Sequence, residues 1–450
     1  MKTLIINGTI VDPSQQLLGK GWLLIEGDLI KECALGEAPK SSEDVNVIDA
    51  KGAYVTPGFI DLHVHLREPG QESKETIESG SNAAVAGGFS TIVCMPNTIP
   101  PIDHVSLVKF ILLEGKRVGK ANVLPTGTIS KGRLGEELSE IGEMYKAGIV
   151  AITDDGSPVM NSFLMSRASE YAKMFDLLVM DHCEDINFKG SMNEGFYSTK
   201  LGLRGTPSIS EEIMLMRDIM VAGYTGGRIH LQHVSTGLGI YMVRDAKKRG
   251  VKVTCEVTPH HMSLTDADLE TYDTNFKMSP PLRTEEDRKK LIEGLMDGTV
   301  DCIATDHAPH TYTNKDVEFD NAPNGIIGME TALPVSYTTL VKENKMPVMR
   351  LVELMSTNPA KILRLPSKGT LKAGSDADVT VWTADKEYKI NTATFKSRAR
   401  NCPFQGKSVF GQVLLTKYVY QPLGALGHGD VFGGIALDHF PFDQVFAETL

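Results

Sequence analysis

Short apolar runs separated by turn residues fill the first 54 positions of the chain. The runs are Leu4-Ile5-Ile6, Thr9-Ile10-Val11, Trp22-Leu23-Leu24-Ile25 and Leu29-Ile30, and Asn7-Gly8, Asp12-Pro13 and Gly27-Asp28 interrupt them. Runs this short, bounded by residues that favour tight turns, are typical of strands rather than helices. The pattern therefore predicts a small β unit over residues 1–54.

From Val55 onward, apolar strands alternate with amphipathic helical segments, such as Ser208 to Val221 and Glu285 to Met296, which carry apolar residues at three- and four-residue spacing. The eight candidate strands are Val55–Val64, Phe89–Met95, Ala121–Pro125, Ile149–Thr153, Leu177–Met180, Arg228–Gln232, Val251–Val257 and Val300–Thr305. Eight β/α units over about 250 residues are what a TIM barrel needs. We therefore expect an α/β fold with a TIM-like (β/α)8 barrel over residues 55–365.

After Leu365 the pattern returns to short strands. Candidates are Gly369-Thr370-Leu371, the run from Ala377 to Trp382, and Val409 to Thr416. We infer that residues 1–54 and 366–423 together form one small β-sandwich domain beside the barrel. The tail over residues 424–450 is rich in Gly and Phe, and the sequence assigns it no role.

Composition narrows the class of protein. A chain of 450 residues with 41% apolar content can bury a large core and a smaller domain. The net charge of -11 disfavours a sequence-independent nucleic-acid binder, so we expect a small-molecule partner and no nucleic acid. No apolar run approaches the ~20 residues that span a bilayer, and Asn7-Gly8 interrupts the N-terminal run before a signal-peptide core could form. These features predict a cytoplasmic protein that does not enter membranes.

The six cysteines are scattered and include no C-x-x-C pair. Neither a disulfide framework nor a cysteine zinc site is indicated, and reduced, partly buried thiols are expected.

The first barrel strand is expected to end in a pair of histidines, His63 and His65. Side chains two residues apart in a strand point to the same face, so both imidazoles can reach one metal ion. Imidazole is a common ligand of zinc-like ions. Taken alone, the pair could equally consist of ordinary hydrogen-bonded side chains.

Four more strands are followed by histidines or carboxylates. The segments are Asp154-Asp155-Gly156, Asp181-His182-Cys183-Glu184, His233-Val234-Ser235 and Asp306-His307-Ala308-Pro309-His310. Any one of them has a plain structural interpretation, for example a turn at Asp154-Asp155-Gly156 or a core histidine at His182. Because the carboxyl ends of barrel strands converge on one mouth, five such ends together predict a metal site there.

Six motifs make the sequence similar to a known family. D-L-H-V-H-L-R-E-P-G, M-P-N-T, D-H-C-E, Q-H-V-S-T, S-P-P-L-R and A-T-D-H-A-P-H together resemble the dihydroorotases of the amidohydrolase superfamily, over a stretch from about Leu4 to Tyr420. The resemblance implies the fold expected above and the reversible interconversion of N-carbamoyl-L-aspartate and (S)-dihydroorotate plus water in pyrimidine (UMP) biosynthesis. It also implies zinc, with one or two ions per subunit.

The resemblance also implies a ligand set. His63 and His65 correspond to ligands of the first metal, His182 and His233 to ligands of the second, and Asp155 to an aspartate that bridges them. Other branches of the family, and the related hydantoinases and allantoinases, carry a carboxylated lysine at the bridging position. Residues 151–155 of this chain contain no lysine, which favours the aspartate branch. The family pattern favours Asp155 over its neighbour Asp154, although Asp154 could instead coordinate while Asp155 caps a turn. Asp306 corresponds to a ligand of the first metal and to the general base, which can serve both directions of the reaction.

Substrate recognition is expected to involve the other motif residues. Arg67 can grip a carboxylate bidentately, and Asn97 and His310 can donate further hydrogen bonds to it. The alternatives are a surface salt bridge from Arg67 to Glu68 or Glu72, and a turn at Asn97.

Asn324 and Gly325 are expected to present backbone groups to the substrate ring. Ser279 departs from the asparagine that many dihydroorotases of this branch carry before P-P-L-R, although serine can still form a hydrogen bond. The segment from Thr311 to Ala322 is either a lid over the mouth or an ordinary solvated loop.

The histidines outside the expected site are predicted to be structural or exposed. They are His104, His230, His260, His261, His307, His428 and His439, and of these only His260 and His261, which follow strand seven, could orient a ligand.

Three functions remain open from sequence. The first is an active dihydroorotase, the second is a hydantoinase or allantoinase acting on another cyclic amide, and the third is a non-catalytic dihydroorotase-like scaffold of aspartate transcarbamoylase. Asp155 in place of lysine speaks against the second, and the retained metal ligands speak against the third. We expect a homodimer, and an association with aspartate transcarbamoylase is a further expectation from the resemblance.

Overall fold

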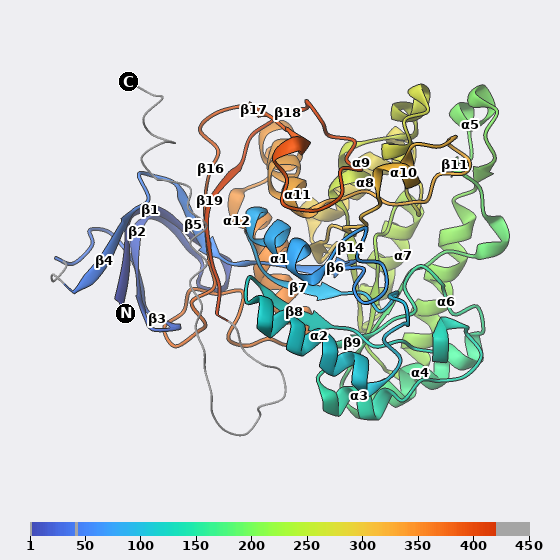
Figure 1. Cartoon of the computed structure of the whole chain (residues 1–450), viewed down its shortest axis with the longest axis horizontal. Coiled ribbons are helices and arrows are strands. Elements are labelled where there is room, and N and C mark those ends of the chain that lie inside the picture. The colour runs from blue at the N-terminus through green and yellow to red at the C-terminus, as the bar shows by residue number, and fades with distance from the viewer. Residues whose placement is uncertain (1, 41–43, 420–450) are drawn as a thin grey trace.

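The two ends of the chain pair in one β-sheet, which forms the sandwich unit on one side of the molecule (Figure 1). The computed structural model describes residues 2–40 and 44–419, so the tail over residues 424–450 lies outside the described residues. The seven strands are β1 (Lys2–Asp12), β2 (Leu17–Glu26), β3 (Leu29–Leu35), β4 (Val45–Asp49), β5 (Tyr54–Pro57), β16 (Val379–Thr383) and β19 (Gln412–Lys417). Their order is β19-β16-β5-β1-β2-β3, with β4 paired to β1. The expectation that the N- and C-terminal segments build one β unit is therefore confirmed.

Several strands of this sheet differ from their predicted limits. The two runs expected on either side of Asn7-Gly8 form the single strand β1, because the strand passes this point with a shift of register between Ile5 and Gly8. Gly369–Leu371, expected as a strand, has no strand structure. The run Val409 to Thr416 is divided between β18 (Ser408–Val409) and β19. The apolar pattern found the sheet but could not show where bulges continue a strand or where loops end one.

The barrel beside this sheet contains eight parallel strands. They are β6 (Phe59–Val64), β7 (Phe89–Cys94), β8 (Asn122–Pro125), β9 (Ala151–Ile152), β10 (Leu178–Asp181), β13 (Ile229–Leu231), β14 (Val253–Val257) and β15 (Cys302–Ile303). Parallel bridges from Gly127 to Ile152 and from Val64 to His307 join the two arcs of strands, so the barrel is closed. The predicted TIM-like barrel with its β-sandwich is confirmed.

The strand expected over Val55–Val64 is two strands in two different sheets. Tyr54–Pro57 is β5, which pairs with β1 and β16, whereas Phe59–Val64 is β6 of the barrel. The break falls at Gly58, where an added Cβ atom would collide with the side chain of Ser90. The apolar run continues across Gly58, so the sequence pattern does not show where the chain passes from one sheet to the other.

Both segments predicted to be amphipathic helices, Ser208 to Val221 and Glu285 to Met296, correspond to helices that cover the barrel. The helices that cover the barrel include α1 (Ile77–Ala86), α2 (Val105–Val118), α3 (Ile141–Ala147), α4 (Ser162–Met174), α6 (Ile209–Thr225), α7 (Gly237–Lys248), α9 (Glu285–Asp297) and α11 (Met329–Ser336). α9 begins after a capping box between Thr284 and Asp287 and ends at Gly298 in the left-handed conformation. Within the described ranges, no helix combines the length and apolar character needed to cross a bilayer.

Residues between β16 and β19 return to the barrel instead of staying with the sandwich. Asn401 donates from Nδ2 to the carbonyl oxygens of Ala308 and Gly325, at 2.9 and 3.0 Å. Its Oδ1 accepts from the backbone N of His310 at 3.1 Å. This C-terminal segment therefore fixes two loops that follow the last barrel strand, a role that its sequence did not indicate.

Candidate metal centre

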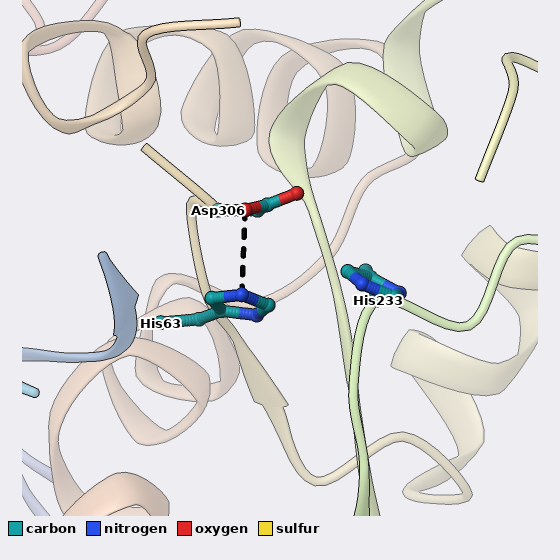
Figure 2. A group of neighbouring side chains, drawn as sticks. All are labelled: His63, His233 and Asp306. Carbon is teal, nitrogen blue, oxygen red and sulfur yellow. Dashed lines mark ion pairs between the residues drawn. The ribbon is translucent and has the colours of Figure 1, made fainter. Parts of the chain in front are cut away.

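His63 and His65 lie at the end of β6 and face the carboxylates of Asp155 and Asp306. His65 Nε2 is 2.8 Å from Asp306 Oδ1, and His63 Nε2 is 3.2 Å from Asp155 Oδ1. Figure 2 shows the contact between His63 and Asp306, in which Nε2 lies 3.3 Å from Oδ1. All four residues are buried. The alternation of side chains in β6 thus brings both imidazoles to one cavity, as the spacing predicted.

His182 and His233 approach the same cavity from the ends of β10 and β13. His182 Nδ1 lies 2.8 Å from His233 Nε2 and 3.8 Å from Asp155 Oδ1. His233 Nδ1 is buried and has no hydrogen-bond partner in the structure. An imidazole nitrogen without a partner in a buried site is available to a ligand.

Potential ligand atoms converge in three overlapping groups. The groups are His63 with His233 and Asp306, His63 with His65 and Asp155, and Asp155 with His182 and His233, and the atoms of each lie within 4.8 Å of one another. Asp155 belongs to one group with the first pair of histidines and to another with the second pair. The carboxylate of Asp155 therefore lies within reach of both pairs of imidazoles.

The charges around this cluster fit a divalent cation. Although burial opposes the shift, the neighbouring imidazoles of His63, His65 and His182 hold the pKa of Asp155 well below its usual range. Burial, reinforced by His182 and His63, holds the pKa of His233 well below its usual range, so this ring is neutral. Although burial opposes the shift, Asp306 and Asp155 raise the pKa of His63 well above its usual range, and Glu184 raises the pKa of His182. Zinc-like ions bind ionised carboxylates and neutral imidazoles, so an ion bound here would displace these protons.

The carboxylate of Asp154 forms its hydrogen bonds with a neighbouring loop and not with residues of the cavity. Its Oδ1 accepts from the backbone N of Ile129 at 2.8 Å and of Ser130 at 3.1 Å, and its Oδ2 accepts from Ser130 Oγ. The carboxylate therefore holds the loop that follows β8. Of the two adjacent aspartates, only Asp155 faces the histidine cluster.

Three residues of the cavity adopt a backbone conformation that non-glycine residues rarely use. The φ angles of Arg67, His233 and Asp306 are 62°, 34° and 46°. Such conformations carry strain and persist where the surrounding structure enforces them, often at functional sites. Here they occur just beyond the ends of β6, β13 and β15.

A cavity of about 240 Å³ opens beside the cluster. The six residues expected to bind substrate all line it, together with His65, Asp155, His182 and Asp306; the six are Arg67, Asn97, Ser279, His310, Asn324 and Gly325. Arg67 is buried, and its Nε donates to the carbonyl of Pro309 at 3.3 Å. It forms no salt bridge to Glu68 or Glu72 in the described part of the chain, so the surface alternative for Arg67 is not observed.

Asn97 and His310 already have protein partners. Asn97 Oδ1 lies 2.8 Å from His65 Nδ1, and its Nδ2 donates to Asp155 Oδ2 at 3.4 Å. His310 Nε2 donates to the carbonyl of Asn324 at 2.8 Å, and its Nδ1 is buried without a partner. Burial and the nearby Arg67 lower the pKa of His310 to about 2, so its Nδ1 is an acceptor in the free site.

Sequence reasoning missed Glu256, a buried carboxylate on β14. Its Oε1 is 2.7 Å from His63 Nδ1 and accepts from the backbone N of His233 at 3.2 Å, while its Oε2 is 3.0 Å from His230 Nε2. Although burial opposes ionisation, His63 and His230 lower the pKa of Glu256 to about 2. His230, which has no motif that links it to the site, therefore contacts Glu256, the carboxylate that holds the candidate ligand His63. The only sequence signal was a charged residue inside an apolar strand.

Glu184, the last residue of the D-H-C-E motif, is a second residue of the site to which the sequence assigned no role. Glu184 Oε2 lies 3.2 Å from His182 Nε2 and accepts from Ser279 Oγ at 2.6 Å. Ser279 therefore orients a partner of His182 while it lines the cavity.

The other described histidines have contacts of their own. His307 Nε2 is 3.2 Å from Glu75 Oε2, His261 Nε2 donates to the carbonyl of Pro280 at 2.9 Å, and His104 caps α2 through the backbone N of Ser106. His260 Nε2 is buried without a partner. His428 and His439 lie outside the described residues.

The segment from Thr311 to Ala322 is packed against the loop that precedes Ser279. It contains the short helix α10 (Tyr312–Lys315), and Lys315 Nζ donates to the carbonyls of Thr274 at 3.0 Å and Pro323 at 2.8 Å. Lys277 Nζ donates to the carbonyl of Phe319 at 2.7 Å. Two lysines thus hold the segment in place in this conformation.

Comparisons with known proteins show what the chain is similar to. A family model described as dihydro-orotase-like matches residues 52–237. A protein named dihydroorotase from Syntrophus aciditrophicus is 47% identical over 428 residues, which cover 94% of this chain and 100% of the relative. Another of that name, from Acetivibrio thermocellus, is 49% identical over 415 residues, covering 92% of this chain and 96% of the relative.

Solved structures with the same fold include cyclic amidohydrolases of other names. An L-hydantoinase (dihydropyrimidinase) from Arthrobacter aurescens superimposes with a TM-score of 0.83 at 25% identity, covering 96% of this chain and 98% of the other. A D-hydantoinase from Thermus sp. gives a TM-score of 0.75 at 26% identity, covering 96% and 97%. The sequence relatives are thus almost twice as similar in identity as these structural relatives.

Proposed function

The chain belongs to the dihydroorotase family and is a cyclic amide hydrolase, and from this premise we propose that it interconverts (S)-dihydroorotate and N-carbamoyl-L-aspartate at the centre described above. The observation that carries the proposal is that Arg67 lines the same buried cavity as Asp155, Asp306 and His65. A carboxylate-binding cation beside a cluster of metal ligands suits a cyclic amide that carries a carboxylate.

We assign the cluster to zinc, with one or two ions per subunit. His63, His65 and Asp306 would hold the first ion, His182 and His233 the second, and Asp155 would bridge them. Imidazole and carboxylate groups without thiolates suit zinc in a catalytic site. Divalent zinc bound here would polarise the amide carbonyl and lower the pKa of water, so that a nucleophile forms near neutral pH.

Asp306 has the position of a proton carrier between water and the ring amide. In hydrolysis, the water oxygen bonds to the amide carbonyl carbon and the ring C–N bond breaks. Asp306 takes the proton from the water and delivers it to the departing nitrogen, which becomes the ureido NH2 group. In the reverse direction, the ureido nitrogen attacks the side-chain carboxylate, and Asp306 takes the proton that this nitrogen releases and passes it to the departing oxygen. A second proton, from solvent, completes the water that leaves.

Arg67 would bind the carboxylate that does not react. Although burial lowers the pKa of Arg67 to about 10, the guanidinium remains charged at neutral pH. His310 can donate to the same carboxylate only after its Nδ1 takes up a proton, and the arriving negative charge favours that uptake. Asn97 supports the site by holding His65 and Asp155, and Ser279, Asn324 and Gly325 line the space for the ring.

A direct assay tests the proposal. Purified, zinc-loaded protein is expected to hydrolyse dihydroorotate and to cyclise N-carbamoyl-L-aspartate, with much less turnover of 5-substituted hydantoin or allantoin. Turnover of hydantoin or allantoin without turnover of dihydroorotate would replace this function with that of a hydantoinase. Protein that binds zinc but turns over none of these compounds would support the non-catalytic scaffold.

Cellular context extends the same proposal. We propose a cytoplasmic enzyme, consistent with six cysteines that are all free thiols. A homodimer and an association with aspartate transcarbamoylase are proposed from the family resemblance.

A further inference from the structure

Asp155 stands beyond the end of its strand, so the hydrogen bonds of the sheet do not fix its position. β9 ends at Ile152, three positions earlier. The chain then turns, with a hydrogen bond from the backbone N of Ser157 to the carbonyl of Asp154 at 2.8 Å and a φ of 73° at Gly156. The place of Asp155 between the two pairs of histidines therefore depends on contacts from outside β9.

Arg133, in the loop after β8, supplies such contacts. Its Nη2 donates to the backbone carbonyl of Asp155 and, at 3.0 Å, to Ser157 Oγ, and it lies 3.5 Å from the carbonyl oxygen of Asp154. The guanidinium thus contacts the turn on both sides of Gly156. Hydrogen bonds from a charged donor are stronger than those between neutral groups, so this side chain can hold the turn in one conformation.

The two loops hold each other in both directions. The carboxylate of Asp154 accepts from the backbone N of Ile129 at 2.8 Å and of Ser130 at 3.1 Å, which fixes the start of the loop after β8. The backbone N of Arg133 donates to the carbonyl of Ser130 at 3.0 Å, and its side chain then returns to Asp154 and Asp155. Because the loops are joined at two points, movement of Asp155 relative to the barrel is restricted.

Arg133 makes these contacts at a cost in free energy. Its φ is 59°, in the left-handed region that residues other than glycine rarely adopt. Its Nε is buried and has no hydrogen-bond partner in the described part of the chain, and a buried donor without a partner is unfavourable. Costs of this kind persist where the surrounding structure enforces them, often at functional positions.

The side chain acts on the candidate ligand and not on the substrate. Gly156 is among the described residues that line the cavity, whereas Arg133 is not. On the cavity side, Asn97 Nδ2 donates to Asp155 Oδ2 at 3.4 Å. Asp155 is therefore held through its carboxylate by Asn97 and through its backbone by Arg133.

We propose that Arg133 is a positioning residue that fixes Asp155 between the two pairs of histidines. The inference rests on the proposed function, because it takes Asp155 as the ligand that bridges two zinc ions. Groups that hold a metal ligand from outside contribute strongly to metal affinity, since a ligand atom must lie close to one position. Asp155 faces both pairs of histidines, so its displacement would weaken binding of either ion.

The zinc affinity of Arg133→Met tests the proposal. Methionine removes the donors and keeps an unbranched side chain, and the zinc dissociation constant, measured by competition of the apoprotein with a chromophoric chelator, is expected to rise by about 10- to 100-fold. In excess zinc, kcat for dihydroorotate is expected to fall by about ten-fold while KM stays within about two-fold, because Arg133 does not line the cavity. Chelator competition needs no substrate, so its result is independent of whether the natural chain turns over dihydroorotate.

Matched variants separate positioning from a loss of charge or of folding. Arg133→Lys keeps the charge and one donor group, so its zinc dissociation constant is expected to rise by less than that of Arg133→Met. Lys131→Met removes an exposed cation of the same loop, which pairs with Glu137 at 2.8 Å, and is expected to leave zinc affinity within about two-fold of the natural value. Urea unfolding of each apoprotein shows that the variant is folded, and Arg133→Gln replaces Arg133→Met if the latter is not.

Two outcomes would overturn the proposal. One is a natural zinc dissociation constant in Arg133→Met, which would leave Arg133 with a structural role alone even if the free energy of unfolding were lower. The other is an equal rise of the dissociation constant in Lys131→Met, which would assign the effect to the charge of the loop rather than to the contacts with the turn.

Discussion

Glu256 Oε1 lies 2.7 Å from His63 Nδ1, and both side chains are fully buried. Contact with the carboxylate holds a proton on Nδ1 and leaves Nε2, the nitrogen that faces Asp155 and Asp306, free to bind metal. The same Glu256 oxygen accepts from the backbone N of His233. One carboxylate therefore positions ligands from two strands of the barrel.

The first prediction concerns this positioning residue. Glu256→Gln is expected to weaken zinc binding by about 10- to 100-fold, because an amide holds the His63 proton less strongly than a carboxylate. Zinc affinity of the apoprotein, measured by competition with a chromophoric chelator, checks it. Thr254→Val removes the partner of His230 Nδ1 without touching Glu256 and serves as the control. Equal zinc affinity in Glu256→Gln and the natural chain would leave Glu256 with a purely structural role.

Asp306 is the proposed proton carrier. Asp306→Asn cannot accept a proton, so kcat is expected to fall by about 10²- to 10⁴-fold in both directions of the reaction while the circular dichroism spectrum is kept. Metal analysis of the same preparation separates loss of the base from loss of a ligand. A variant that retains its zinc and turns over at a near-normal rate would remove Asp306 from the mechanism.

Arg67 is the proposed carboxylate ligand. Arg67→Met is expected to lower kcat/KM for dihydroorotate by about 10²-fold or more, because a buried carboxylate would lose its charge-assisted partner. Zinc content should not change, since Arg67 is not a ligand. Arg67→Lys is the matched variant and should recover part of the loss by restoring the charge without the bidentate geometry. If kcat/KM were unaltered in Arg67→Met, another group would have to bind the carboxylate.

Much of the site was predictable because barrel geometry converts strand order into spatial proximity. Parallel strands bring their carboxyl ends together, and six residues lie at or just beyond such ends: His63, His65, Asp155, His182, His233 and Asp306. The contacts of Glu256 and Asn401 could not be predicted in the same way. Each of these residues reaches the site through hydrogen bonds to residues far away in the chain, and neither stands in a motif that specifies its partner.

The fold, too, could be predicted only in part: its two domains could be predicted, but the boundary between them could not. Alternating apolar segments gave the barrel and the β unit, but the passage between them at Gly58 depends on close packing against Ser90 and Asp378. Hydrophobic periodicity reports which face of an element is buried and carries no signal for the sheet in which a strand pairs. β4 was not predicted for a different reason. Its residues are only partly buried or exposed, so the strand carries no clear apolar pattern.

The last prediction concerns Lys315, which holds the segment beside the cavity. Burial, together with the positive charge of Lys277, lowers the pKa of Lys315 from 10.5 to about 7. Between these two values the unfolded chain binds more protons at this residue than the folded chain, so the free energy of unfolding rises with pH across that window and falls again as pH drops toward 7. Lys315→Met removes this titration. The gain in unfolding free energy between about pH 7.5 and about pH 9.5 is expected to be smaller in the variant by on the order of 2 kcal/mol.

Urea unfolding at the two pH values measures that gain for the natural chain and for Lys315→Met. The substitution also removes the hydrogen bonds from Nζ to Thr274 and Pro323, so the variant is expected to be less stable at both pH values. Only the difference between the pH values reports the titration, because the lost hydrogen bonds lower both measurements. Exposed Lys372→Met, with no buried ammonium to remove, should keep the natural pH dependence. An unchanged pH dependence in Lys315→Met would show that the amine is solvated and fully charged in the folded protein.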